Sequence, residues 1–383
     1  MPGSAEPLAG QRPKFEVDDE VAFFNTANLS PLLRSVHAAG EAALDRRAKP
    51  WSIASADWFS DVEALRARFA RLVNASPDDI ALVPATSYGL AVVARNVTAG
   101  PGDRVLVLAE EFPSNYYTWQ RFTQRTGAEL VIVERVPGAS WTDAILEAID
   151  ERVALASVPN VHWTNGALVD LERVSEAVRA AGAVFVIDAS QSLGAMPLDV
   201  TALRPDAVVS VGYKWLLGPF SLGYLYLGQR FHEGEPLEEN WILRAGAEDF
   251  TALVDYEDDY LAGARRFDMG QRTSFHLTPM AVAALDQLLD WGVPRVAATL
   301  RARTDQIAAG ADRLGIGVPP PDTRGPHMLG LEFPDEAAER VAVALAESVV
   351  IASLRGSSLR VAPHLHNSDR DVQRLLDALA SAL

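Results

Sequence analysis

Seven short apolar segments, each rich in β-branched residues, recur through the middle of the chain and are separated by stretches with helical periodicity. Short apolar runs of this kind are typical of buried strands. In the stretch 170–179, Leu171, Val174 and Val178 share one helical face, and Gly182 follows as a helix stop. Alternating strands and helices form a mostly parallel sheet covered by helices on both faces, with ligands at the carboxyl ends of the strands. The predicted strands are 80–83, 105–108, 130–133, 153–158, 184–187, 208–211 and 224–227.

The sequence changes character after about residue 230, where a polar, aromatic and glycine-containing stretch begins. A long helical pattern follows at about 279–291, and further helical patterns and short strands occupy the last hundred residues, with strands expected at 328–331 and 358–361. The first part of the large domain, about 16–50, is also able to pack on the small domain. We therefore expect a flexible N-terminal tail (1–15), a large α/β domain with the seven-stranded sheet (16–260) and a small C-terminal α+β domain (261–383).

Composition excludes several classes of function. The 383-residue chain has no cysteine, which excludes disulfides, thiolate metal sites and a cysteine nucleophile, and we expect no metal site. Its net charge of −17 opposes binding to nucleic acid or to an anionic membrane surface. No apolar run approaches the roughly 18 residues of a membrane-spanning helix. The N-terminus lacks the layout of a signal peptide, so we expect a cytoplasmic protein.

Asp188 and Lys214 are the most informative pair of polar residues. Asp188 ends a predicted strand, and Lys214 follows the next strand 26 residues later (214 − 188). A buried carboxylate is costly without a cationic or hydrogen-bonding partner, and an amine desolvated by apolar neighbours becomes nucleophilic. Pyridoxal phosphate (PLP) needs this pair, because the acid binds the pyridinium nitrogen and the lysine forms the Schiff base. The alternatives are a helix N-cap for Asp188 and a surface lysine for Lys214.

The run 188–223 resembles the class V aminotransferase family of fold-type I PLP enzymes, which includes cysteine desulfurases, kynureninase, isopenicillin N epimerase-like proteins and carbon–sulfur lyases. The resemblance includes the motif Gly-Tyr-Lys-Trp-Leu-Leu-Gly-Pro around Lys214 and extends from 23–28 to 358–363. It rests on the order and spacing of the motifs together more than on any single one. It implies a fold-type I PLP-dependent transferase fold and PLP as the cofactor. It also implies that Lys214 binds the cofactor and acts as the base for the substrate's α-proton.

The resemblance further suggests which residues bind the cofactor. Thr86 and Ser87 follow a predicted strand and open a helix, where free amides and hydroxyls bind a phosphate group. Within the family this segment matches the phosphate-binding turn, although a Thr-Ser pair is also a common N-cap. Phe112 matches the position that stacks on the pyridine ring, with a core phenylalanine as the alternative.

Five further residues are assigned to the cofactor site by the same resemblance. Asn160 matches a position that reaches the cofactor or the substrate, and Gln191 matches one that hydrogen-bonds the phenolic oxygen, unless it is an ordinary loop residue. Tyr213 is a candidate phosphate ligand, or else it only packs. Gln271 and Thr273 resemble a segment that reaches the neighbouring subunit's phosphate in homodimeric members, although a surface loop explains it equally well. We therefore expect a homodimer with active sites at the interface.

The substrate-binding candidates begin with Arg360, which matches the family arginine that pairs with the α-carboxylate of the substrate. Arg355 is a second candidate, with a surface ion pair as the alternative. Asn28 and Trp163 are expected to line the side-chain pocket, together with the aromatic stretch 241–260. The substrate is expected to be an amino acid or an amino-acid conjugate that is larger and more polar than alanine.

The missing cysteine narrows the reaction. Cysteine desulfurases carry a catalytic cysteine shortly before the carboxylate arginine, where this chain has 351–355 without one, so persulfide formation on the enzyme is excluded. Elimination, transamination and epimerisation remain open, because each needs only the lysine, the acid and the cofactor. We favour a carbon–sulfur β-lyase, since the motifs 111–115 and 161–164 resemble those of lyase-like members, with an aminotransferase or epimerase as the alternative. A non-catalytic binding protein is disfavoured by Lys214 and Asp188.

Overall fold

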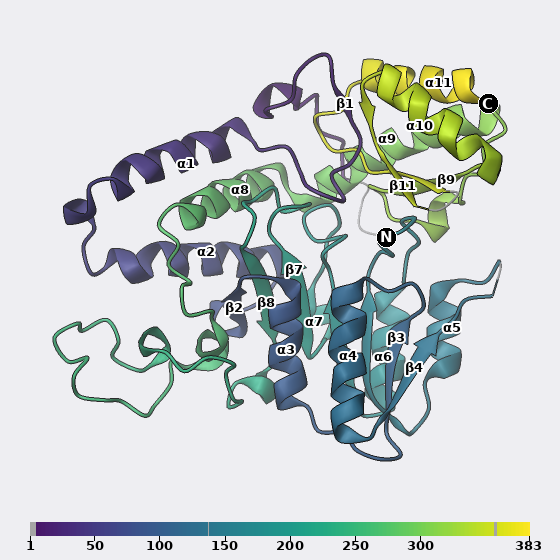
Figure 1. Cartoon of the computed structure of the whole chain (residues 1–383). Helices are drawn as coiled ribbons and strands as arrows, with labels where there is room; N and C mark the ends of the chain where they lie inside the picture. The colour runs from purple at the N-terminus through teal and green to yellow at the C-terminus, as the bar shows by residue number, and fades with distance from the viewer. Residues whose placement is uncertain (1–4, 137, 356–357) are drawn as a thin grey trace.

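The computed structural model describes residues 5–136, 138–355 and 358–383, and its largest element is a seven-stranded sheet (Figure 1). Its strands are β2 (Ile80–Val83), β3 (Arg104–Leu108), β4 (Glu129–Val133), β5 (Val153–Pro159), β6 (Val184–Asp188), β7 (Ala207–Val211) and β8 (Gly223–Leu227). They pair in the order β2-β8-β7-β6-β5-β3-β4, and β8 is antiparallel to both of its neighbours whereas the other pairs are parallel. The seven predicted apolar segments are these strands, so the predicted mostly parallel α/β sheet is confirmed.

Helices cover both faces of this sheet. They are α1 (Arg34–Arg47), α2 (Asp57–Val73), α3 (Thr86–Asn96), α4 (Pro113–Thr126), α5 (Trp141–Ala148), α6 (Leu171–Ala180), α7 (Val200–Leu203) and α8 (Leu277–Trp291). Strand side chains alternate between the faces, so Leu106 packs in a cluster with α2, α5, α6 and α8, and Val107 packs in a second cluster with α3 and α4. Strands apolar on both faces are typical of parallel sheets. Asp170 caps α6 by accepting hydrogen bonds from two backbone amides, as expected for its helical pattern.

The C-terminal part of the chain forms a smaller α+β unit. It contains α9 (Val293–Arg313), β9 (Leu329–Glu332), α10 (Ala338–Glu347), β10 (Val350–Ile351), β11 (Ser353–Arg355), β12 (Ser358–Val361) and α11 (Asp369–Ala382). Strands β11, β12 and β9 form an antiparallel sheet in that order, and a third apolar cluster fills the space beneath its helices. Helix α8 buries Ala284 and Leu285 in the cluster of the main sheet rather than in this third cluster. The division into domains at residue 260 stays a prediction.

The N-terminal residues pack against the C-terminal elements. Strand β1 (Ala22–Phe23) pairs in parallel with β10, and the Arg12 guanidinium forms an ion pair with Asp371 at 2.9 Å. Phe15 is 1% exposed and stacks on Trp291 at 6.0 Å between ring centroids. The sequence predicted a flexible tail over 1–15, of which 1–4 lie outside the described residues. Phe15, at the end of that range, is buried against an apolar partner, and the flexibility of the residues before it stays a prediction. Among the described helices, none has both the length and the apolarity needed to cross a membrane.

Candidate active site

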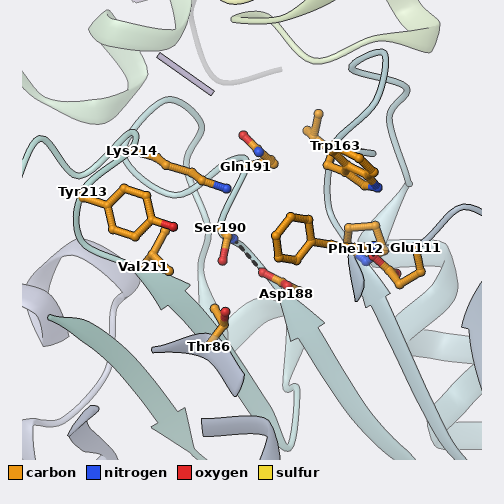
Figure 2. A pocket seen from close by; sticks show the side chains of 12 residues that line it. Thr86, Glu111, Phe112, Trp163, Asp188, Ser190, Gln191, Val211, Tyr213 and Lys214 are labelled. Atoms are coloured by element: carbon orange, nitrogen blue, oxygen red, sulfur yellow. Dashed lines mark hydrogen bonds between the residues drawn. The ribbon is translucent and has the colours of Figure 1, made fainter. Parts of the chain in front are cut away.

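A pocket opens at the carboxyl ends of β3, β5, β6 and β7, where ligands bind in parallel sheets (Figure 2). The structure brings seven residues predicted from the sequence to this pocket. It also adds Glu111, Ser190 and three apolar residues that the sequence did not single out. The lining consists of Thr86, Glu111, Phe112, Pro159, Val161, Trp163, Asp188, Ser190, Gln191, Val211, Tyr213 and Lys214.

Lys214 lies in the tight loop between β7 and β8. The amide of Gly212 donates to the carbonyl of Leu222 at 2.8 Å, and the amide of Gly218 donates to the carbonyl of Gly212 at 2.8 Å. A Cβ atom at position 212 would lie 2.7 Å from the Leu222 carbonyl oxygen, so the loop requires glycine there. The loop holds the lysine side chain 8% exposed, with Nζ 5.4 Å from the ring centroid of Phe112. The amine therefore points into the pocket, as Figure 2 shows.

The environment of Lys214 favours its neutral, nucleophilic form. The pKa of the amine is lowered to about 8, mainly by burial. The Asp188 carboxylate opposes this shift because it favours the charged form, and the positive charge of Arg360 adds to the shift. A lysine with this pKa is able to act as a nucleophile and as a proton acceptor near neutral pH. The structure thus agrees with the sequence-based assignment, which itself stays a prediction.

Asp188 closes the floor of the pocket at the end of β6. Its Oδ1 accepts a hydrogen bond from the Ser190 amide at 2.9 Å, and burial raises the pKa of the carboxyl. Within the described residues no side-chain cation lies within 4.0 Å of it. A buried carboxyl in this state is stabilised by a cationic partner, and the pyridinium nitrogen of PLP is such a group. The residues present therefore fit the predicted cofactor.

Glu111 is a second buried carboxyl in the pocket, and the sequence analysis gave it no role. Its Oε1 accepts a hydrogen bond from the Phe112 amide at 2.7 Å, whereas Oε2 is buried without a protein partner. Burial, reinforced by repulsion from Asp188, raises the pKa of Glu111 to about 8. The available signal was its position after β3, because β3 and β6 end at the same edge of the sheet. The pocket is therefore lined by two buried carboxyls, and the charge of one disfavours ionisation of the other.

The opposite side of the pocket suits an anion. Helix α3 begins there at Thr86, and its N-cap residue Ala85 makes no side-chain capping hydrogen bond. Backbone amides of the first turn therefore remain able to donate to an anion. A Cβ at Gly89 would lie 2.9 Å from a methyl carbon of Val209, so glycine lets α3 approach β7 closely. Tyr213 is half-buried beside Lys214, and burial raises the pKa of its hydroxyl. These features are suited to a phosphate group.

Gln191 is held in one orientation above Asp188. Its Oε1 accepts a hydrogen bond from the Trp215 indole nitrogen at 3.0 Å, and its Nε2 donates to the carbonyl of Ala27 at 3.0 Å. An indole only donates, so the orientation of the amide is fixed by chemistry. One N–H of Gln191 remains available, which suits the predicted hydrogen bond to a phenolic oxygen.

Two arginines from the C-terminal sheet contact Trp163, one of the residues that line the pocket. Arg360 is 2% exposed and donates to the carbonyl oxygen of Trp163 at 2.7 Å and, at 3.5 Å, to Oδ1 of Asn25. The Arg355 guanidinium lies over the Trp163 ring, 5.7 Å from its centroid. The same indole meets Phe112 edge-on at 5.6 Å, so Trp163 forms a wall between the two arginines and the predicted ring-stacking residue.

Besides Arg355 and Arg360, five predicted site residues do not line this pocket. Asn160 is buried but points away, because side chains alternate at the end of β5 and its neighbours Pro159 and Val161 face the pocket. Ser87 and Asn28 are exposed and are not among the lining residues. Gln271 and Thr273 line a separate surface cavity of about 720 Å³ beside Trp58. A contact of these two residues with the other subunit's phosphate stays a prediction.

Comparisons with known proteins found relatives that are similar over most of the chain. An uncharacterized aminotransferase of Bacillus subtilis, YcbU, is 27% identical over 325 residues, 83% of both chains, and the isopenicillin N epimerase of Streptomyces clavuligerus is 25% identical over 96% of both. Two structures of the cystine C-S lyase C-DES share the fold at 19% and 18% identity. Their TM-scores are 0.87 and 0.85, and the matches cover 97% and 94% of this chain and 99% and 98% of theirs. One of these carries glycine covalently linked to PLP.

A family model described as aminotransferase class-V matches residues 46–367. This match confirms the resemblance seen in the sequence, and with it the predicted PLP cofactor and the prediction of an enzyme. The protein belongs to the class-V aminotransferase family.

Proposed function

We propose that this enzyme is a carbon–sulfur β-lyase that acts on a cysteine conjugate. The observation that carries the proposal is the Lys214 amine, buried in the pocket with its pKa lowered to about 8, in a chain without any cysteine. The amine is suited to remove the α-proton, and sulfur has no acceptor on the protein. The sulfur-containing product therefore leaves to solution.

Each residue of the site has a distinct role in the proposed reaction. Arg360 binds the α-carboxylate, and Lys214 Nζ accepts the proton from Cα. When bound, PLP supplies the electron sink for the pair left by that proton, and Asp188 keeps its ring nitrogen protonated. The Cβ–S bond then breaks, the thiolate departs with the bonding pair, and a proton converts it to a thiol. One water completes the balance, so each conjugate yields one thiol, one pyruvate and one ammonium ion.

The cystine C-S lyase that shares this fold supports the proposal by analogy of fold. Transamination is the second candidate, and the uncharacterized aminotransferase YcbU, similar over most of the chain, favours it. That reaction needs a proton returned to the cofactor and a keto acid as the second substrate. Lys214 is able to make that transfer, so the products must decide between the two reactions.

The test is a product assay. The holoenzyme is incubated with S-alkyl cysteines and with alanine and glutamate, without any keto acid, and thiol, pyruvate and ammonium are measured. A lyase forms all three in equal amounts from the cysteine conjugates alone. Lys214→Ala is the matched control and should form none. The aminotransferase would be favoured if none of the cysteine conjugates yielded these three products and the bound PLP were converted stoichiometrically to its amine form.

We also propose that the enzyme works as a homodimer in the cytoplasm. The support for the homodimer is a partly exposed aromatic cluster, in which successive ring centroids lie within 6.5 Å of one another. Its members are Trp58, Phe59, Trp241, Phe250 and Phe275. Trp241 is 39% exposed, and the cavity that contains Gln271 lies beside Trp58. Exposed apolar clusters often mark subunit interfaces. Light scattering that finds an active monomer at micromolar concentration would contradict the proposal.

A further inference from the structure

Arg360 differs from the other buried arginines of the chain. Four other arginines are at most 9% exposed, and each has a carboxylate oxygen within 4.0 Å. Among the residues that the structure describes, neither Arg360 nor Arg355 has such a partner. The residues outside the description contain no Asp or Glu. Among the described residues, Arg360 is therefore the one buried arginine without a carboxylate partner.

The two arginines project from the same face of one sheet. In the antiparallel pair β11–β12, Arg355 lies opposite Ser358 and Arg360 lies opposite Ser353. Residues two apart on a strand share a face, so the arginines occupy diagonal positions about 7–8 Å apart. The Nε atoms of both arginines and the Ser358 Oγ are buried without a hydrogen-bond partner. Unused donors in this arrangement form two adjacent positions for anions.

The arrangement is electrostatically costly without a ligand. Burial, together with the like charge of Arg355, lowers the pKa of Arg360 to about 10. A single α-carboxylate bound bidentately by Arg360 leaves the donors of Arg355 unused. The Trp163 ring packs against the Arg355 guanidinium and against Phe112. A substrate whose α-carboxylate binds Arg360 can therefore extend its side chain along this indole to Arg355.

We propose that the substrate carries a second carboxylate, which binds Arg355 while the α-carboxylate binds Arg360. The proposal rests on the proposed function for the identity of the amino-acid substrate, and it names the substrate class as a dicarboxylic amino acid or a cysteine conjugate that ends in a carboxylate. Arg355 is then the residue that determines specificity. The same pair of arginines discriminates against substrates with an apolar side chain.

The test uses ligands that cannot react, so that it is independent of the reaction type. Calorimetry measures binding of succinate, glutarate and adipate to the holoenzyme, each beside the monocarboxylate of equal length, such as hexanoate for adipate. We expect the best dicarboxylate to bind at least about tenfold more tightly than its monocarboxylate. Arg355→Gln should remove this advantage and leave monocarboxylate binding unchanged, and Arg355→Lys should keep part of it. Arg360→Gln should weaken both ligands.

Arg71→Gln, at an exposed arginine in the last turn of α2, is the matched control and should change neither affinity. Three results would overturn the proposal. They are equal affinity for the two ligand types, an advantage that survives in Arg355→Gln, and equal weakening of both ligands in that variant, which would assign Arg355 to the α-carboxylate. A failed lyase assay with an intact dicarboxylate preference would overturn only the proposed reaction.

Discussion

The lowered pKa of Lys214 can be measured directly because the chain contains only three lysines, Lys14, Lys49 and Lys214. With a pKa of about 8, roughly a quarter of the Lys214 amine is neutral at pH 7.5, compared with about one part in a thousand for an amine at 10.5. The neutral fraction is therefore more than about a hundredfold larger than for an ordinary lysine. This difference is what makes the lysine reactive before any cofactor binds.

The assay is trace acetylation of the cofactor-free enzyme between pH 6 and 11, with each lysine peptide quantified by mass spectrometry. The exposed Lys14 and Lys49 serve as internal references. The midpoint of the pH profile carries the information, because burial slows access of the reagent at every pH. We expect the Lys214 profile to level off above about pH 8 to 9. A profile that still rises at pH 10.5 would refute the argument from burial.

Two substitutions test the causes of this shift in opposite directions. Asp188 favours the charged amine, so Asp188→Asn should move the Lys214 midpoint to lower pH. Arg360 disfavours the charged amine, so Arg360→Gln should move the midpoint to higher pH. Movement of both variants in the same direction would show that a structural change, and not the local charges, controls the midpoint.

Other predictions follow from the site and the core. Lys214→Ala should lose the borohydride-reducible linkage to PLP and all turnover, with an unchanged thermal unfolding midpoint; trapping at the wild-type yield would show that another group binds the cofactor. Asp188→Asn should retain some PLP but lose most turnover, because a neutral partner no longer keeps the ring nitrogen protonated; wild-type turnover would reduce Asp188 to a helix cap. Burial lowers the pKa of His327 and of His366 to about 4 from 6.5, so each histidine stabilises the fold above pH 6.5 and this stability is lost as the pH falls toward 4. At pH 5 each buried histidine should lower the free energy of unfolding by about 2 kcal/mol. Urea titration should therefore find that the free energy of unfolding falls less between pH 7.5 and pH 5 in His327→Asn than in the wild type.

The sheet could be predicted closely from the sequence. The seven apolar runs matched the strands to within a residue at either end, because parallel strands buried on both faces read as continuous apolar segments. Strand β11 had no such signal: Ser353 and Arg355 are polar, and the strand is defined by its pairing with β12. Phe15 was assigned to a tail because its neighbours are polar, although it packs against Trp291.

The site was predictable where a motif marked it and not where the fold decided the direction of a side chain. Lys214 and Asp188 followed strands that the sequence revealed, so their meeting at one edge of the sheet could be expected. Glu111 was overlooked because its burial against Asp188 depends on strand order, which the sequence does not state. Asn160 was assigned to the pocket by resemblance, whereas the alternation of β5 turns it away.

The proposed lyase reaction is tested most directly by counting turnovers without a keto acid. Purified holoenzyme at a known concentration of bound PLP is mixed with an S-carboxyalkyl cysteine, and pyruvate is measured against time. The proposal predicts pyruvate in many-fold excess over active sites, matched by equal amounts of thiol and ammonium. The proposal would be contradicted if no pyruvate formed and the reaction stopped once the bound PLP had been converted to its amine form. In that case the reaction would resume only when a keto acid is added.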